Sequence, residues 1–281
     1  MKFSLVMATL NRCTEIIPLL DSLVNQSHKD FELIIIDQND DDRIEKLCSG
    51  YPLNIRIIKN AVKGLSVNRN LGLKYISGDI IAFPDDDCEY SHVTLEKAAC
   101  FFEQNLSYDF YTCNVKERTG SDSILLCNNC DAEINLDNFM TTSISFTLFI
   151  RAASIASFKF DEQLGLGAKY GSAEESDLVL FLIKNNNKGY YHAHTYIYHP
   201  RSQRSINSLI SYGKGFGALH KKAITYYHFY RFLLQFFIIL LKETIKLIFL
   251  FPKNERLAVI KGRLFGFFYY KVSHPYEKNF N

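Results

Sequence analysis

Residues 80–88 read Ile80-Ile81-Ala82-Phe83-Pro84-Asp85-Asp86-Asp87-Cys88, so an apolar run leads directly into three adjacent carboxylates. The proline marks the point at which a strand would have to end. Three like charges repel one another, and burying them without a partner is costly. A divalent cation that is held by oxygen ligands and shared with a phosphate relieves both problems. The stretch therefore predicts a metal and phosphate site at a strand end.

Apolar strands alternate with helical patterns around this stretch. Strand-like runs cover residues 3–10, 31–36, 55–58 and 79–83, and helical spacing marks 16–24 and 65–76. Strands that are apolar throughout and alternate with amphipathic helices are typical of a mostly parallel sheet with helices on both faces. The sequence therefore predicts an α/β fold with a Rossmann-like first half.

Polar side chains follow three of the predicted strands. Thr9, Asn11 and Arg12 lie at the end of the first strand, Asp37 and Gln38 at the end of the second, and the three aspartates at the end of the fourth. Parallel sheets bind ligands at the carboxyl ends of their strands, so we expect these groups to share one edge. No Gly-rich loop follows the first strand, which argues against a phosphate loop or a dinucleotide fingerprint. Phosphates are then expected to be held by a metal and side chains.

The chain resembles the family 2 glycosyltransferases, which are inverting enzymes with a GT-A fold. The resemblance rests on VMATLNR (6–12), IIIDQND (34–40), GLSVNRNLGL (64–73) and GDIIAFPDDD (78–87), and continues through FDE (160–162) and AEESDL (173–178) to YHP (198–200). It implies transfer of a sugar from a nucleoside-diphosphate sugar to a hydroxyl group with inversion. The chain has no Trp and so lacks the QxxRW signature of processive synthases, which favours transfer of a single sugar.

The resemblance identifies the three aspartates as the DXD motif of the family. It implies that Asp85 and Asp87 bracket a Mn²⁺ or Mg²⁺ ion, that Asp86 or Asp87 contacts the metal, and that Asp85 faces the donor sugar or ribose. Asp87 is the preferred metal ligand. A late His contacts the metal or diphosphate in many GT-A enzymes, which makes His199 a candidate, although a lone His beside Pro is usually structural. The nucleotide contacts implied by the resemblance are Thr9, Asn11, Arg12 and Arg69.

The second strand departs from the family pattern. Two aspartates often follow it in the family and recognise the base, but here Asp37 is followed by Gln38. An amide oxygen can accept a hydrogen bond from a pyrimidine N3–H, without the assistance of a charge. We therefore expect a UDP or dTDP sugar as the donor.

A second carboxylate cluster, Glu174-Glu175-Ser176-Asp177, opens an apolar helix expected over 178–183. Carboxylates in a first helical turn are common because they complement the helix dipole. The resemblance instead implies a catalytic base at this position, with Glu175 as the first choice and Glu174 as the second. Asp177 is expected to anchor the neighbouring loop, and the glycine-rich segment 165–171 to close over an acceptor.

The C-terminal third differs in charge from the rest. Residues 1–199 hold 18 Lys and Arg against 27 Asp and Glu, whereas residues 200–281 hold 14 against 3. A helix with small residues is expected over 208–222. In the apolar helix expected over 232–251, Arg231, Gln235, Lys242 and Lys246 fall on one stripe with His228. Such a stripe disfavours a membrane span and favours a helix in the membrane interface, with its lysines toward lipid phosphates. Packing on the catalytic domain or on another subunit is the alternative.

These observations predict a GT-A catalytic domain over 1–200, with a nucleotide-sugar half (1–115) and an acceptor half (116–200). A basic, apolar, membrane-associating extension would follow over 201–281. The first residues form a strand rather than a signal peptide, so we expect a cytoplasmic protein, peripheral on the inner face of the cell membrane. That location suits a lipid-linked glycan acceptor in polysaccharide biosynthesis, and the apolar tail argues against nucleic acid.

Two other functions fit parts of the pattern. One is a membrane-anchored nucleotide-sugar-binding or scaffolding protein, in which the two glutamates only begin a helix. The other is a nucleotidyltransferase, which would need a Gly/Arg/Lys-rich loop after the first strand.

Overall fold

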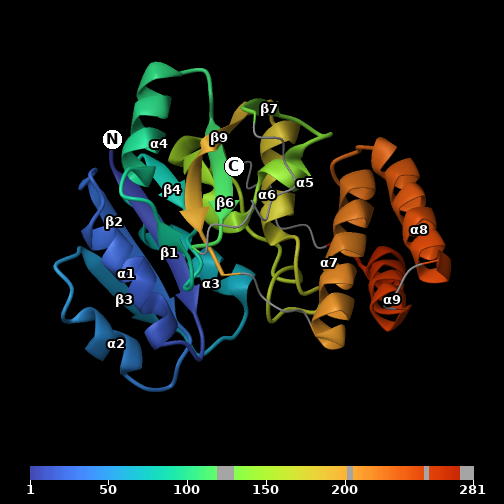
Figure 1. Cartoon of the computed structure of the whole chain (residues 1–281), viewed down its shortest axis with the longest axis horizontal. Coiled ribbons are helices and arrows are strands. Elements are labelled where there is room, and N and C mark those ends of the chain that lie inside the picture. The colour runs from blue at the N-terminus through green and yellow to red at the C-terminus, as the bar shows by residue number, and fades with distance from the viewer. Residues whose placement is uncertain (119–129, 201–204, 250–252, 273–281) are drawn as a thin grey trace, which may run out of the picture. The chain divides into compact units, whose positions relative to one another are not determined.

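The computed structural model describes residues 1–118, 130–200, 205–249 and 253–272. The chain divides into two compact units, and Figure 1 labels most of their elements. The sheet unit comprises Met1–Lys63, Asn68–Ser157 and Asn185–Arg201. The helical unit comprises Gly64–Val67, Phe158–Lys184 and Ser202–Asn281.

The sheet unit is built on one nine-stranded sheet in the order β3-β2-β1-β4-β8-β6-β9-β5, with β7 paired to β9. The predicted strands are β1 (Phe3–Thr9), β2 (Phe31–Asp37), β3 (Ile55–Lys59) and β4 (Ile80–Ala82). These four are mutually parallel. The other strands are β5 (Glu89–Tyr90), β6 (Phe110–Lys116), β7 (Ala132–Ile134), β8 (Phe149–Arg151) and β9 (Gly189–Tyr198).

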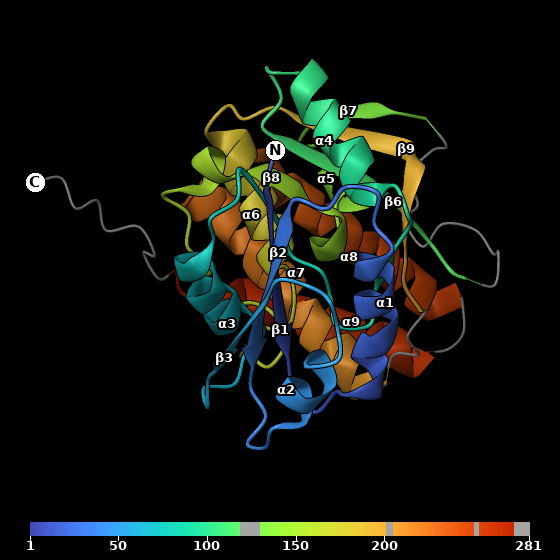
Figure 2. The same cartoon turned by 90° about the vertical axis from the view of Figure 1, so that its left-hand side faces the viewer.

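Helices cover both faces of the parallel strands. They are α1 (Ile17–Val24), α2 (Arg43–Cys48), α3 (Leu65–Gly72), α4 (Thr94–Gln104) and α5 (Phe139–Thr142). Figure 2 shows α1 and α3 on opposite sides of β1 and β2. Nearly every residue of β1 and β2 is buried, as continuous apolar strands require when both faces are covered. At Gly72 a Cβ would lie 2.3 Å from Val6 Cγ1, so glycine permits α3 to approach the sheet.

The sheet is more mixed than the sequence indicated. Of the eight pairings among the described strands, four are parallel and four antiparallel, because β8 runs antiparallel between β4 and β6 and β9 runs antiparallel to β5 and β7. The short strands β5, β7 and β8 have two or three residues each, too few to show a period in the sequence. The predicted α/β class holds, but parallel pairing is confined largely to the first half.

The helical unit contains α6 (Glu174–Lys184), α7 (Ile206–Thr225), α8 (Arg231–Phe249) and α9 (Lys253–Tyr269). Helices α7 and α9 meet through glycines at near backbone contact. A Cβ on Gly217 would lie 2.1 Å from the carbonyl oxygen of Arg263, and one on Gly266 would lie 2.0 Å from that of Lys214. The small residues expected to permit close packing therefore do so. The last two residues of the helix expected over 232–251 lie outside the described residues.

Helix α8 is the most apolar of these helices, and its length raises the question of a membrane span. Among the residues that the structure describes, no helix combines the length and the apolar content needed to cross a bilayer.

Candidate donor site and candidate base

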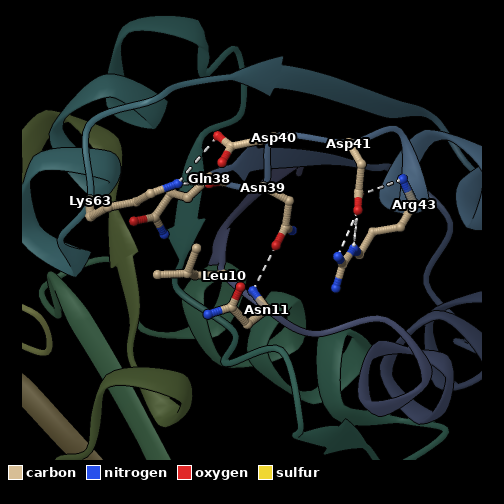
Figure 3. A pocket seen from close by; sticks show the side chains of 8 residues that line it. All are labelled: Leu10, Asn11, Gln38, Asn39, Asp40, Asp41, Arg43 and Lys63. Carbon is tan, nitrogen blue, oxygen red and sulfur yellow. Dashed lines mark hydrogen bonds and ion pairs between the residues drawn. The ribbon is translucent and has the colours of Figure 1, made fainter.

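The segments that follow β1 and β2 line a pocket of about 300 Å³, to which Lys63, beyond the end of β3, also contributes (Figure 3). Gln38 lines this pocket, and its side-chain amide donates to the carbonyl oxygen of Thr9 over 3.3 Å. Asn39 Oδ1 accepts from the backbone N–H of Asn11, whose φ of 58° turns the chain sharply after β1. The full lining is Leu10, Asn11, Gln38, Asn39, Asp40, Asp41, Arg43 and Lys63.

Asp37 is fully buried beside the pocket and outside its lining. Its Oδ2 accepts from Lys59 Nζ at 2.8 Å, and its Oδ1 accepts from the backbone and side chain of Asn39 at 2.9 and 2.7 Å. Both oxygens are thus used to hold the loop after β2. Gln38, the residue that departs from the family pattern, is the one that faces the pocket.

The three aspartates after β4 occupy different environments. Asp85 Oδ1 lies 3.3 Å from Arg69 Nη2 and accepts from Ser145 Oγ at 3.3 Å. The Arg69 side chain is only 2% exposed and its guanidinium lies over the ring of Phe83. A buried guanidinium so close to Asp85 balances part of the negative charge of the cluster.

Asp86 is the most buried member of the cluster. Its Oδ2 accepts from Thr9 Oγ1 at 2.8 Å, and its Oδ1 lies 3.9 Å from Arg12 Nε. Burial raises the pKa of Asp86 to about 6, although the Thr9 hydroxyl and the Arg12 charge act in the opposite direction. The ends of β1 and β4 therefore meet at this side chain, as the parallel pairing of the two strands predicts.

Asp87 joins two further elements of the sheet unit. Its Oδ2 lies 3.2 Å from Arg12 Nη2 and its Oδ1 lies 3.0 Å from His199 Nε2. The antiparallel pairing of Glu89 with Tyr198 brings the two residues together, because each lies one or two positions beyond that pair. The hydrogen bond from His199 lowers the pKa of Asp87. Burial would lower the pKa of His199, but the hydrogen bond and charge of Asp87 outweigh it and raise that pKa.

The His199 ring is fixed from two other sides. Its Nδ1 donates to the carbonyl oxygen of Pro200 at 2.7 Å, and the ring stacks on Phe146 with centroids 4.6 Å apart. A histidine that donates one ring N–H to a carbonyl oxygen presents its other nitrogen to a metal in many metalloproteins. This places an imidazole nitrogen and a carboxylate oxygen side by side.

These side chains fit a divalent cation that completes its coordination with substrate. No cluster of three or more His, Cys, Asp or Glu ligands is present within the described ranges. Mg²⁺ and similar ions at nucleotide sites are commonly held by one or two protein ligands together with phosphate oxygens and water. Asp87 and His199 would supply two such ligands, and Asp85 lies two residues before Asp87 on the same loop.

The candidate bases begin α6 in the helical unit. Glu174 is 5% exposed, whereas Glu175 is more accessible and its Oε1 accepts from Ser176 Oγ at 3.2 Å. The Glu174 carboxylate lies against Gly165, where a Cβ would be 3.2 Å from Glu174 Oε2. Gly165 has a φ of 96°, which glycine tolerates best. Loop 165–171 therefore packs on Glu174 and leaves Glu175 the more accessible carboxylate.

A buried ionic cluster supports the first turn of α6. Lys222 Nζ on α7 donates to Asp177 Oδ2 at 2.8 Å and to Asp161 Oδ2 at 3.1 Å, and all three side chains are fully buried. Tyr227 donates to Asp177 Oδ1 at 2.9 Å, and Tyr270 donates to Asp161. Asp177 thus anchors the first turn of α6 to α7, whereas the sequence leads us to expect that it anchors the neighbouring loop.

Several residues of the sites were not found by sequence reasoning. Lys59 ends β3 directly opposite Asp37, so the strand-end argument could have included it. Ser145 and Phe146 follow no recognisable pattern, and their contacts with Asp85 and His199 come from the tertiary fold. Lys222 belongs to an ordinary helical run, and nothing in the sequence marks it as buried.

Residues 4–152 match the model of Glycosyl transferase family 2, which is slightly more than half of the chain. The chain belongs to this family. The minor teichoic acid biosynthesis protein GgaB of Bacillus subtilis is 28% identical over 203 residues, which is 66% of this chain and 21% of GgaB. An uncharacterized glycosyltransferase of Haemophilus influenzae is 32% identical over 38% of this chain and 36% of its own length. The chain thus spans well under half the length of these two curated relatives.

A third family relative is covered more evenly. The GalNAc(5)-diNAcBac-PP-undecaprenol beta-1,3-glucosyltransferase of Campylobacter jejuni is 26% identical over 73% of this chain and 67% of its own length.

Solved structures share the fold. Residues 1–349 of Staphylococcus aureus TarS in complex with UDP-GlcNAc match with a TM-score of 0.63 and 23% identity, covering 80% of this chain and 67% of that one. The mannosyltransferase PcManGT of Pyrobaculum calidifontis in complex with GDP-Man and Mn²⁺ matches with a TM-score of 0.66 and 13% identity, covering 96% and 88%. The expected GT-A fold is confirmed.

Proposed function

We propose that this protein transfers a single sugar from a nucleoside-diphosphate sugar to a hydroxyl group of a glycan acceptor. The observation that carries the proposal is the meeting of Asp87 with Arg12 and His199 at one edge of the sheet. A carboxylate and an imidazole for a metal, with a guanidinium beside them, are the groups that a departing diphosphate requires. Family membership supports the same reaction.

The donor that fits best is a UDP or dTDP sugar. The base would lie in the pocket after β1 and β2, which Gln38 lines. Lys63, which contacts the Gln38 carbonyl oxygen and lies 3.7 Å from Asp40, supplies a positive charge at its rim. The TarS complex with UDP-GlcNAc supports a uridine nucleotide. Thr9, Asn11 and Arg12 would line the path from the base to the diphosphate.

Mn²⁺ or Mg²⁺ would be held by Asp87 and His199, with Asp85 nearby, and would supply charge neutralisation for the diphosphate leaving group. Arg12 and Arg69 add fixed positive charge around it, and Asp85, held by Arg69 and Ser145, would face the sugar or ribose. The Mn²⁺ in the PcManGT complex supports a divalent metal.

Glu175 would act as the base and remove the proton from the acceptor hydroxyl as that oxygen attacks the anomeric carbon with inversion. Its greater accessibility compared with Glu174 favours it for contact with an acceptor. The bond between Asp177 and Lys222 holds α6, the helix that carries Glu175. Glu174 is the second choice.

The acceptor we propose is a lipid-linked glycan at the cytoplasmic face of the cell membrane. The names of the Campylobacter and Bacillus relatives, one acting on an undecaprenol-linked glycan and one in teichoic acid biosynthesis, support this. Residues 1–200 would carry catalysis and residues 201–281 would associate with the membrane.

A screen of UDP, dTDP and GDP sugars for Mn²⁺- or Mg²⁺-dependent binding and hydrolysis tests the proposal. We expect one UDP or dTDP sugar to bind only with metal, and Asp87→Ala to weaken that binding at least about tenfold. Asp30→Ala is the control, because Asp30 is exposed ahead of β2. If the affinity for the sugar nucleotide is the same with and without metal and in Asp87→Ala, the proposed donor site is wrong. Binding by the wild type without transfer to any lipid-linked acceptor would instead indicate a sugar-binding protein.

A further inference from the structure

Helix α8 exposes its most apolar side. Six side chains at helical spacing form one stripe along it, which we call the α8 stripe. All six are more than 40% exposed, and Leu234, Leu241 and Ile248 exceed 60%. The α8 stripe comprises Leu234, Phe237, Ile238, Leu241, Ile245 and Ile248. Soluble proteins rarely expose a contiguous apolar surface of this kind unless something binds to it.

The opposite side of α8 buries Phe232 and Phe236 together with the charged side chain of Glu243. Glu243 is 7% exposed and accepts from Lys246 Nζ at 2.9 Å and, across the helix pair, from Arg256 of α9 at 3.3 Å. Gln235 Oε1 and two guanidinium nitrogens of Arg263 are also buried and have no hydrogen-bond partner among the described residues. Buried polar atoms without a hydrogen bond are unfavourable, so the inner side of α8 is less well satisfied than the core of a soluble protein.

Helix α8 therefore presents an apolar side outward and pairs the charge of Glu243 on its inner side, whereas a surface helix usually turns its apolar side inward and its charges to water. This arrangement of the two sides fits a helix whose outer side contacts hydrocarbon, because charged groups are then best paired on the protein side. Lys246, expected from the sequence to reach lipid phosphates, is held by Glu243. Lys242 is exposed at the margin of the α8 stripe and remains available to them.

Charge decides between a bilayer and a second copy of the chain as the occupant. The described residues from 205 to 272 contain eleven Lys and Arg but only two Glu, and of these Glu243 is neutralised by two cations. Two copies joined through α8 would bring two strongly basic surfaces together. An anionic lipid surface complements the same charge.

We propose that α8 lies in the membrane interface with the α8 stripe against the acyl chains and Lys242 at the level of the lipid phosphates. This rests on the membrane location proposed above and specifies which face of which helix makes the contact. The Glu243–Lys246–Arg256 cluster stays on the protein side of α8.

Vesicle flotation with the full chain tests the face. Wild type and the triple variant Leu234→Ser/Leu241→Ser/Ile248→Ser are mixed with vesicles of phosphatidylcholine and phosphatidylglycerol, and with phosphatidylcholine alone. We expect the triple variant to partition about 100-fold more weakly, because three large apolar side chains lose their burial in lipid. Leu106→Ser, which removes a leucine that is 80% exposed in the sheet unit, should partition like the wild type.

A tryptophan probe tests the same contact in a folded protein whose α8 stripe keeps its apolar character. The chain contains no Trp, so a single substitution reports from one place. Leu241→Trp should be quenched by vesicles brominated in the acyl chains, and Leu106→Trp should not. Circular dichroism and metal-dependent donor binding, measured in solution for each variant, show whether the two units are intact.

The outcomes separate the two proposals. Equal partitioning of wild type and triple variant, or no quenching of Leu241→Trp on vesicles that bind the protein, overturns the assigned face. If the wild type binds no vesicle, the membrane location is overturned. If the wild type is a dimer and the triple variant is a monomer, the α8 stripe is instead the contact with a second copy of the chain. If the wild type shows no metal-dependent donor binding, the proposed donor site is wrong, but the proposed membrane face of α8 is unaffected.

Discussion

Asp85, Asp86 and Asp87 are identical and adjacent, yet each meets a different cation or hydroxyl. Asp85 faces the buried Arg69, Asp86 faces the Thr9 hydroxyl, and Asp87 lies between Arg12 and His199. Asp86 and Asp87 lie in a turn that is closed by a hydrogen bond from the Cys88 N–H to the Asp85 carbonyl oxygen, so the three side chains point in different directions and can contact three parts of a ligand. Substitutions at the three positions should therefore have distinct effects on donor binding.

The first prediction concerns the base. Glu175→Gln keeps the size of the side chain but removes its ability to take a proton, so kcat should fall by about 100- to 10,000-fold. The affinity for the donor, measured by titration calorimetry, should change less than about twofold. Glu174→Gln is the matched control. A larger kcat loss in that variant than in Glu175→Gln would give the role of base to Glu174.

The second prediction concerns His220 on α7, which is fully buried among the rings of Phe216, Phe232 and Phe236. Burial lowers its pKa to about 4, and the charge of Arg263 on α9 acts in the same direction. The unfolded chain therefore binds this proton more readily than the folded one. The contribution of neutral His220 to the free energy of unfolding is fully present above about pH 6.5. It falls by about 3 kcal/mol as the pH drops toward 4.

Chemical denaturation between pH 7 and pH 4 measures this effect. In His220→Phe the loss of unfolding free energy over that range should be smaller by about 3 kcal/mol than in the wild type. His194→Phe, at an exposed position, should leave the pH dependence unchanged. An identical pH dependence in wild type and His220→Phe would contradict the assignment.

At the scale of elements, the sequence predicts the parallel strands β1, β2 and β4 well because each is a largely apolar run followed by polar residues, whereas β3 contains Arg56 and has no buried residue. Burial of both faces leaves that pattern in the residues themselves. The pairing of β5 with β9 is different, since it joins Glu89 to Tyr198 across more than one hundred residues. The approach of Asp87 to His199 depends on that pairing, so the family resemblance could suggest it but the strand pattern could not.

The third prediction concerns the glycine contact between α7 and α9. Alanine is the better helix former by about 1 kcal/mol, so an isolated helix would gain from Gly266→Ala. Here its Cβ would lie 2.0 Å from the Lys214 carbonyl oxygen, and backbone atoms cannot yield as a side chain can. We expect a net loss of about 3 kcal/mol of unfolding free energy.

Urea denaturation checks this value, and Gly50→Ala is the control. A Cβ on Gly50 would meet nothing closer than 4.0 Å, so that variant should stay within about 0.5 kcal/mol of the wild type. Equal stability of the two variants would show that the helices can separate at little cost.

At the scale of the whole molecule, the buried ionic cluster links residues that are far apart in the sequence. Lys222 bonds with Asp161 and Asp177, which lie 61 and 45 residues before it. Composition could show that the last third is basic but could not show that one of its lysines is buried beside the helix of the candidate base. That partnership depends on burial, and an isolated helical pattern does not reveal it.

The fourth prediction removes that lysine. Lys222→Met leaves two carboxylates buried without their cation, so the free energy of unfolding should fall by about 3–5 kcal/mol at pH 7. Burial by itself would raise the pKa of either aspartate, so the deficit should shrink in acid as they become protonated. Lys221→Met, one residue earlier and only half-buried, should cost less than about 1 kcal/mol in the same denaturation experiment.

The hydrogen bond from Tyr270 to Asp161 spans 109 residues. A ribosome must therefore complete more than a hundred further codons after Asp161 before this carboxylate can receive its third donor, after the Gln163 N–H and Lys222. Until then the buried carboxylate pair beside the start of α6 lacks one of its hydrogen bonds. Chain synthesis itself thus delays the final setting of the candidate base, and a nascent chain that has stopped short of α9 should hold α6 loosely.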